Sequence, residues 1–218
     1  MKNSITLNEY RKLKLSDLRK EEYRHLLLLL YWPLYCLFFL YIERFAPGDY
    51  TPVHAALDEA IPFCEGFIIP YFLWFPYLAG MLLYTLFRDI DSFRRLMKYF
   101  ILTFTAAVVL YRLFPNCQQL RPEIMPRENL FARLTAALYW IDTPTNVCPS
   151  EHVIGSAGAV FAAWNAPRLR KHRWWILALG LVICISTVFV KQHSVLDHLA
   201  AMPVCLAGWL LCFHRKQT

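Results

Sequence analysis

The sequence lacks the marks of several common classes of protein. It has no CxxC pair, no Cys/His spacing typical of a zinc site, no internal repeat and no low-complexity tract. No small-residue cleavage site follows the first apolar run, so we expect a signal anchor rather than a cleavable signal peptide. Charged residues are sparse, at 18% of the chain. These absences argue against a zinc-based or repeat architecture and against an ordinary soluble domain.

The chain is instead rich in apolar residues. Aliphatic, aromatic and Cys residues make up 57% of its 218 residues, and the mean hydropathy is +0.34. Several apolar runs approach the roughly 20 residues that a helix needs to cross a bilayer. We therefore predict an all-α fold, with a charged leader over residues 1–24 and one six-span transmembrane bundle over residues 25–218. The spans are expected near residues 25–42, 61–87, 97–114, 152–166, 174–191 and 193–213.

The net charge of +7 is distributed as in a membrane protein rather than a nucleic-acid-binding one. Seven Lys and Arg precede the first span, four lie in each of two connectors and two end the chain, against six on the opposite side. This asymmetry predicts cytoplasmic termini in a multi-pass integral membrane protein. Its expected partners are membrane lipids, not nucleic acid, and the oligomeric state is left open. The leader fits either an interfacial helix or a solvated segment.

The long segment 115–151 then lies on the extracytoplasmic side. Within it, four apolar residues recur at helical spacing and predict a helix on the membrane surface. They are Leu130, Leu134, Leu138 and Ile141.

The junction of the last two spans carries the strongest chemical signal. In a helix, His193 and Asp197 would lie one turn apart on the same face. A carboxylate there can accept the Nδ1 proton of the imidazole and leave Nε2 free and more basic. The alternative is a polar pair that satisfies itself inside a helix bundle.

Two further polar clusters lie on the same predicted face. Arg121 offers a planar fork of donors for phosphate oxygens. Ser150 and His152 precede or begin a predicted span, and helix N-termini suit an anion. Two histidines, one of them backed by a carboxylate, supply a nucleophile and a general acid, as phosphoryl transfer requires.

These residues resemble the three motifs of the type-2 phosphatidic acid phosphatase superfamily of membrane phosphatases and phosphotransferases. The family pattern is Lys, six residues, Arg-Pro; then Pro-Ser-Gly-His; then Ser-Arg, five residues, His, three residues, Asp. The resemblance covers roughly residues 61–213. The matching residues are Arg121-Pro122, Pro149-Ser150-Glu151-His152, and Ser186-Thr187 with His193 and Asp197.

The resemblance implies a role for each matching residue. His193 would attack phosphorus to form a phosphohistidine, and Asp197 would orient its imidazole. His152 would protonate the leaving alkoxide and later activate the acceptor. Arg121 and the region of Ser150 would hold the phosphate. The resemblance implies no metal and no cofactor.

Three positions depart from the family pattern. Phe114 occupies the position of the first-motif Lys, Glu151 that of the second-motif Gly and Thr187 that of the third-motif Arg. Thr187 stays a candidate for phosphate binding at that position. Lys191 would lie on the same side as Thr187 if the helix continued, so it is a candidate replacement for the missing Arg in phosphate binding. The alternative is a lysine that only snorkels to the interface.

Two cysteines stand four residues before a motif. Cys117 precedes Arg121, and Cys148 precedes His152. If the motifs meet at one phosphate, the thiols could form a disulfide on an oxidising face. Two free thiols are the alternative.

The resulting functional prediction is an enzyme, a metal-independent hydrolase of lipid phosphates (monoesters or diphosphates) with its active site at the outer membrane face. The loss of family basic residues is similar to the branch that makes inositol phosphorylceramide and sphingomyelin, so a phosphotransferase is the first alternative. A channel or transporter with a proton path through the histidines is another. A zinc hydrolase using His152, His193 and Asp197 is a third.

Overall fold

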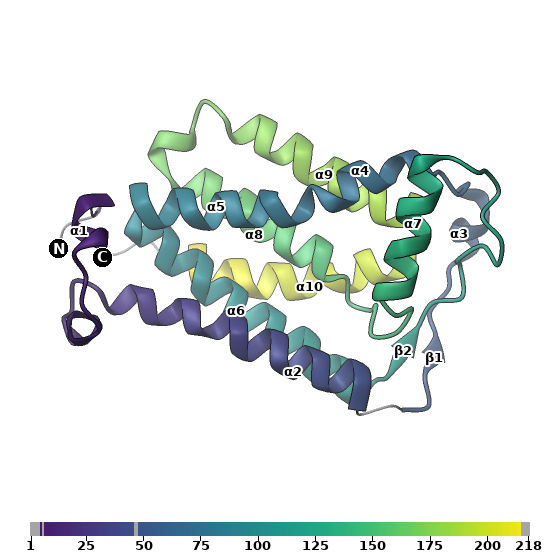
Figure 1. The fold of residues 1–218 in the computed structure, drawn as a ribbon, viewed down its shortest axis with the longest axis horizontal. Helices are drawn as coiled ribbons and strands as arrows, with labels where there is room; N and C mark the ends of the chain where they lie inside the picture. Colours follow the sequence, from purple (N-terminus) through teal and green to yellow (C-terminus); the bar gives the residue numbers. More distant parts are fainter. Residues whose placement is uncertain (1–4, 6, 46–47, 215–218) are drawn as a thin grey trace.

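The computed structural model describes residues 5, 7–45 and 48–214, and within these ranges the chain is mostly helical (Figure 1). The long helices are α2 (Tyr31–Phe45), α5 (Trp74–Arg88), α6 (Ile90–Leu113), α7 (Leu130–Ile141), α8 (Glu151–Asn165), α9 (Arg173–Phe189) and α10 (Val195–Trp209). The short helices are α1 (Leu7–Arg11), η1 (Leu15–Arg19), η2 (Arg24–Leu30), α3 (Ala56–Ala60), η3 (Glu65–Phe67), α4 (Ile68–Phe72), η4 (Pro167–Leu169) and η5 (Leu210–His214). The strands β1 (Thr51–Pro52) and β2 (Asn116–Cys117) form one parallel pair.

Four helical segments of the described chain are long and apolar enough to cross a membrane. They are Arg24–Phe45, Glu65–Arg88, Ile90–Leu113 and Val195–His214. The predicted all-α membrane fold is confirmed at this level. The helices α8 and α9 also lie where spans were predicted, but they have only 15 and 17 residues.

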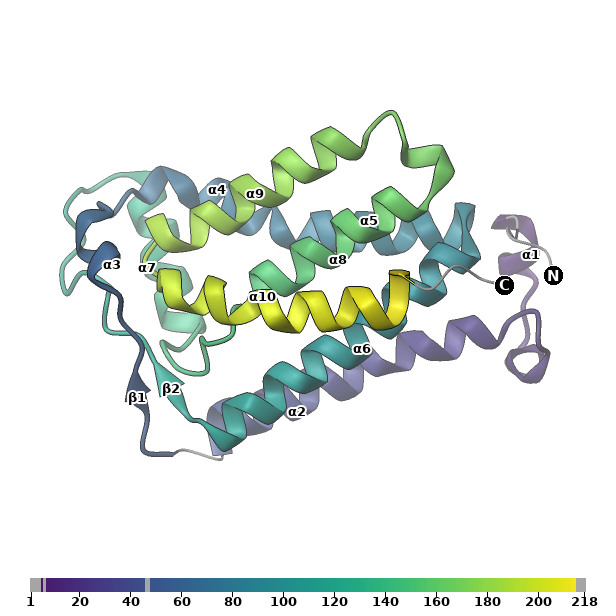
Figure 2. The same ribbon diagram turned by 180° about the vertical axis from the view of Figure 1, so that it is seen from behind.

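The helix α8 is the centre of the bundle, and it packs against α5, α6, α9 and α10 (Figure 2). Its small residues permit this close packing. A Cβ on Gly158 would lie 2.6 Å from a ring carbon of Tyr99 on α6, nearer than real Cβ atoms approach. A Gly- and Ala-rich helix can therefore approach its neighbours closely.

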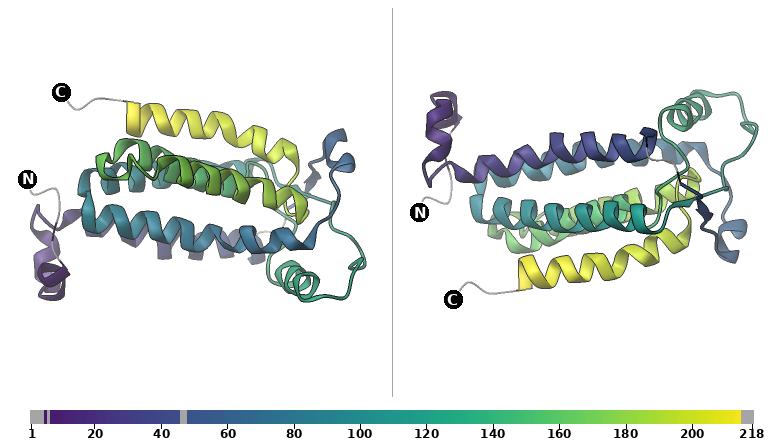
Figure 3. Two further views of the ribbon diagram at one scale, coloured as in Figure 1. Left: turned by 90° about the horizontal axis from the view of Figure 1, so that it is seen from above. Right: turned by 90° about the horizontal axis from the view of Figure 1, so that it is seen from below.

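The two ends of the bundle differ in what covers them. The leader helix α1 and the far end of α10 lie at one end, while α3, β1, β2 and α7 lie at the other (Figures 1 and 3). The helix α7 crosses the bundle end, and it confirms the helix predicted from Leu130 to Ile141. All of the predicted motifs meet at this second end.

One predicted boundary was wrong. The third long helix begins at Ile90 rather than near residue 97, because Asp89 caps it by accepting a hydrogen bond from the Ser92 N–H (3.1 Å). The described residues of the leader form two short helices, α1 and η1. The hydroxyl of Tyr10 bonds with the ring Nε2 of His25 (2.9 Å) and donates to the carbonyl of Leu86 (3.4 Å).

Candidate active site

The predicted His193–Asp197 pair is present and almost fully buried. The Nδ1 of His193 lies 2.9 Å from Oδ2 of Asp197, and the side chain of Asp197 is inaccessible to solvent. The same oxygen accepts the N–H of Ser194 at 3.0 Å, so the carboxylate also closes a capping box at the start of α10. The pair therefore forms across a helix N-terminus, although residues 190–194 themselves are not helical.

His152 completes the predicted constellation. It lies in the first turn of α8, and its Nδ1 is 3.3 Å from Nε2 of His193. The rings of Tyr71 and Trp74 pack against its imidazole at centroid distances of 4.6 and 4.5 Å. Within the described residues its Nε2 has no hydrogen-bond partner. The Nδ1–H group of His193 donates a hydrogen bond to Asp197, which leaves the Nε2 lone pair of His193 free to accept one. The Nδ1–H group of His152 is then the donor to that lone pair.

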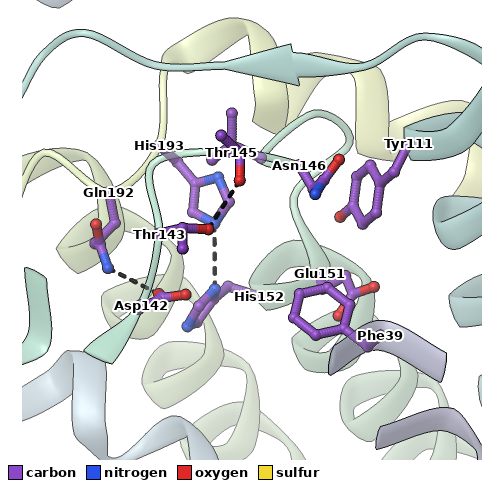
Figure 4. A pocket seen from close by; sticks show the side chains of 11 residues that line it. Phe39, Tyr111, Asp142, Thr143, Thr145, Asn146, Glu151, His152, Gln192 and His193 are labelled. Carbon is purple, nitrogen blue, oxygen red and sulfur yellow. Dashed lines mark hydrogen bonds between the residues drawn. The ribbon is translucent and has the colours of Figure 1, made fainter. Parts of the chain in front are cut away.

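The two histidines face a small cavity of about 70 Å³, in which Gln192 and Asp142 also point toward them (Figure 4). Most of its lining residues carry a polar side-chain group, and no Lys or Arg belongs to its lining among the described residues. The lining residues are Phe39, Tyr111, Asp142, Thr143, Thr145, Asn146, Val147, Glu151, His152, Gln192 and His193.

Arg121 reaches this cavity through a neighbour. Its guanidinium donates to Oε1 of Gln192 (2.5 Å) and to the carbonyls of Asp142 (3.0 Å) and Tyr139 (3.2 Å). It also lies 4.4 Å above the ring of Tyr139. Burial lowers the pKa of Arg121, but guanidinium stays charged in proteins. The fork that the sequence assigned to phosphate is thus beside the cavity and already bonded.

Asp142 and Gln192 are site residues that the sequence reading missed. Asp142 follows α7 as its C-cap, and its carboxylate faces the cavity. Oδ2 of Asp142 accepts from Gln192 (2.9 Å) and from the hydroxyl of Tyr71 (3.3 Å). Burial raises the pKa of this carboxyl, and the charge of Arg121 opposes the rise. Adjacency to His193 was the only sequence signal for Gln192.

A second, apolar cavity of about 650 Å³ adjoins the first. Helices α2, α5 and α7 supply most of its walls, and it is mainly aliphatic and aromatic. Phe39, Asp142, Glu151 and His152 line both cavities. These four residues therefore form the boundary between the two cavities. The remaining residues around the apolar cavity are Trp32, Tyr35, Cys36, Tyr71, Phe72, Trp74, Phe75, Leu78, Ala79, Leu82, Phe104, Leu134, Ala137, Leu138 and Ile141.

Glu151, which stands where the family has Gly, contributes its carboxyl to that boundary. The hydroxyl of Tyr35 donates to its Oε2, while its Oε1 has no partner among the described groups. Glu43, at the end of α2, accepts hydrogen bonds from Thr143 and Asn146 of the cavity loop. The cavity is therefore surrounded by more carboxyl groups than basic ones.

Ser150 and Thr187 are placed differently from each other. The N–H of Ser150 donates to the carbonyl of Asp197 (3.0 Å), and its hydroxyl is buried without a partner in the described chain. It is therefore close to the histidines, as predicted. The hydroxyl of Thr187 bonds instead with the carbonyl of Cys184 and with Nε2 of His198, both at 2.8 Å. Those contacts hold Thr187 to α10 and not to the cavity.

The premise that placed Lys191 beside Thr187 was wrong. The helix α9 ends at Phe189, and Lys191 follows in a left-handed conformation (φ 54°) that turns its side chain away. Its ammonium donates to the carbonyls of Asp58 (2.8 Å) and Ile61 (2.5 Å). It borders a separate cavity of about 520 Å³. Lys191 is thus neither at the cavity of the two histidines nor snorkelling, since it is 7% exposed.

Cys117 and Cys148 are free thiols, so the hypothesised disulfide is not formed. The side chain of Asn116 joins the two segments instead. Its Nδ2 donates to the carbonyl of Cys148 (2.8 Å), and its Oδ1 accepts from the N–H groups of Val147 (2.9 Å) and Cys148 (2.8 Å). Burial, with the nearby Asp197 carboxylate, raises the pKa of Cys148 to about 12.

Comparison of the chain with protein-family models, with curated proteins and with solved structures found no significant match.

Proposed function

We propose that the protein is a membrane enzyme that removes phosphate from a lipid phosphomonoester or diphosphate through a phosphohistidine on His193, without a metal ion. The observation that carries this proposal is the meeting of two unlike cavities at His152. A lipid has the same two parts, a polar phosphate and apolar chains. With its chains in the apolar cavity, its phosphate would lie against the histidines.

The geometry supports a two-step reaction. Nε2 of His193 attacks phosphorus as the bond from phosphorus to the lipid oxygen breaks, and Nδ1 of His152 gives its proton to the departing alkoxide. Asp197 holds the other side of the imidazole and stabilises its positive charge. Water then attacks the phosphohistidine while His152 takes up a proton, and phosphate leaves. The two ring nitrogens lie 3.3 Å apart, so His152 has to move aside when phosphorus enters between them.

The arrangement of the helices supports a proposal for membrane placement. We propose six passes, with both termini cytoplasmic and the active site on the extracytoplasmic side. The long helices other than α7 run between the leader end and the histidine end (Figure 3). At about 1.5 Å per residue α8 and α9 are about 23 and 26 Å long, so adjoining loops complete their passage through a core of about 30 Å.

A lipid phosphotransferase is the second candidate, and one observation favours it. Among the described residues that line the polar cavity, Asp142 and Glu151 are acidic and none is Lys or Arg. A phosphomonoester carries up to two negative charges, whereas a phosphodiester carries one. A site with few cations therefore suits a phosphodiester lipid, from which a phospho-head group would pass through His193 to an alcohol acceptor.

A lipid panel with the purified protein tests these proposals. Phosphatidic acid, a lipid diphosphate and phosphodiester lipids are offered with and without an alcohol acceptor, and free phosphate and transfer products are measured. We expect product formation that resists a chelator and is lost in His193→Ala but kept in His54→Ala. The control residue His54 is exposed and pairs with Glu59 outside the cavity.

Each alternative has a distinct outcome in this panel. Loss of activity with chelator would favour a zinc hydrolase. Turnover retained in His193→Ala would reject the phosphohistidine. The absence of any product, together with ion flux in protein-containing vesicles, would favour a channel or transporter.

A further inference from the structure

The loop that carries His193 is held by a segment from another part of the chain. We define the nucleophile turn as residues 189–195 and the strap as residues 51–64, which link α2 to η3. The strap is itself anchored, since the N–H groups of Thr51 and Val53 donate to the carbonyls of Pro115 (3.0 Å) and Cys117 (2.7 Å). It precedes nearly all of the region that resembles the phosphatase family.

Asp58 makes the central contacts between strap and turn. Its Oδ2 accepts from the hydroxyl of Ser194 (2.5 Å), and its Oδ1 accepts from the N–H of Val195 (2.9 Å). A third donor, the N–H of Ala55, reaches Oδ2 at 2.7 Å. The side chain of Asp58 is 1% exposed. A carboxylate from a distant segment therefore caps α10 at the two residues that follow His193.

Two more contacts fasten the other side of the turn to the strap. The ammonium of Lys191 ends on the carbonyls of Asp58 and Ile61, and the N–H of Cys64 donates to the carbonyl of Phe189 at 3.0 Å. His193 thus lies between Lys191 and Ser194, both of which the strap holds. The left-handed backbone of Lys191 is uncommon for a residue with a side chain, and these hydrogen bonds to the strap account for it.

We propose that Asp58 is a positioning residue for His193. The proposal rests on the function proposed above, in which Nε2 of His193 must approach phosphorus in line with the leaving oxygen. Asp58 is not among the residues that line the cavity of the histidines, so the role proposed for it is positioning and not substrate binding. Its effect passes through Ser194, whose N–H and hydroxyl set the capping box that contains Asp197. A loosened cap would misdirect the imidazole, and a misplacement of about 1 Å can cost about a hundredfold in rate.

The test compares Asp58→Ala and Asp58→Asn with Glu59→Gln as the matched control. Glu59 is the next residue, and its side chain is 77% exposed. In Asp58→Ala we expect kcat to fall by about 30-fold or more while KM stays within about threefold, because positioning is lost and binding is not. Asp58→Asn retains one acceptor oxygen, so part of the rate should return. Glu59→Gln should match the wild type.

A second readout does not depend on turnover. In protein labelled with ¹⁵N-histidine, the proton between His193 and Asp197 should give a downfield resonance that disappears in His193→Ala. We expect this resonance in the wild type and in Glu59→Gln, and its shift or loss in both Asp58 variants. Melting temperatures in detergent identify a variant that has not folded. If Asp58→Ala does not fold, the rate and the resonance of Asp58→Asn test the proposal.

The outcomes separate this proposal from the function on which it rests. A folded Asp58 variant with an unchanged resonance and a kcat within about twofold of wild type would overturn the role of Asp58. If the resonance changes in the Asp58 variants but the protein turns over none of the lipids, the positioning role of Asp58 would be upheld and the enzymatic proposal rejected.

Discussion

The two sides of the nucleophile turn differ in how fully their polar groups are satisfied. On the strap side, Asp58 accepts three hydrogen bonds and Lys191 donates to two carbonyls. On the cavity side, Nε2 of His152 and one oxygen of Glu151 have no partner in the described chain. A satisfied group holds its position, whereas an unsatisfied group next to a cavity is available to a ligand. The closed side is therefore suited to positioning and the open side to chemistry.

The same contrast governs two carboxyls. Burial alone would raise the pKa of Asp58, but the hydrogen bonds from Ser194, Val195 and Ala55 outweigh it and lower the pKa. Asp142, with fewer donors, has a pKa that burial raises. One carboxylate is thus stabilised in its ionised form, and the other is not.

The largest effect is expected from removing the nucleophile itself. His193→Ala should lower turnover of any lipid substrate by at least about a thousandfold, because the covalent route is closed. Release of phosphate or head group is the measurement, with His54→Ala as the unchanged control. If His193→Ala kept a tenth of wild-type turnover, His193 would not be the nucleophile.

The two cations beside the turn provide the next test. Arg121→Met should lower kcat/KM by about tenfold or more and weaken inhibition by inorganic phosphate, because a donor next to the cavity is lost. Lys191→Met should leave phosphate inhibition intact and lower the melting temperature, because the Lys191 ammonium donates to two carbonyls of the strap and not to the cavity. Weaker phosphate inhibition in Lys191→Met would restore the role first predicted for this lysine and undo the comparison.

Filling the apolar cavity should have a smaller and selective effect. Ala137 lines that cavity, so Ala137→Phe should raise KM several-fold for a long-chain lipid and leave a short-chain soluble substrate unaffected. The neighbouring residue Ala136 is exposed and outside the lining, which makes Ala136→Phe the control. Equal effects of both variants, or none, would show that the chains bind elsewhere.

The smallest expected effects are on stability, and their signs are opposite. The lowered pKa of Asp58 contributes stability above the ordinary carboxyl range that is lost as pH falls through the folded-state pKa. The raised pKa of Asp142 means that stability is lost as pH rises from the ordinary range through its folded-state pKa. Asp58→Asn should therefore cost more at pH 7 than at acid pH, and Asp142→Asn less, each on the order of 1 kcal/mol.

Melting temperatures in detergent at neutral and acid pH check this pair of predictions. If both variants lost more stability at neutral pH than at acid pH, or both lost less, the contrast between the two carboxyls would be contradicted.

Sequence patterns predicted the parts of the site that depend on local spacing. The separation of His193 and Asp197 is short enough that either a helix or a capping box brings them together. The helical spacing from Leu130 to Ile141 likewise predicted α7. Chain order and membrane orientation placed His152 at the same end.

What could not be predicted depends on where a helix stops and on distant segments. Because α9 ends at Phe189, the side chain of Lys191 points away from Thr187. No residue type near Phe189 marks the end of a helix in the sequence. Asp58 and Asp142 come from segments that lie between the predicted spans. Only the folded chain shows that one caps the nucleophile turn and the other lines its cavity.

The most direct measurement of the central proposal is the trapping of a covalent intermediate. Wild-type protein and the variant His152→Ala are mixed with p-nitrophenyl phosphate, whose leaving group departs without a general acid, then quenched and analysed by peptide mass spectrometry under non-acidic conditions. We predict a phosphoryl adduct on His193, which accumulates in His152→Ala because the base for its breakdown is missing. Turnover without any adduct on His193, or an adduct on a different residue, would contradict the proposal.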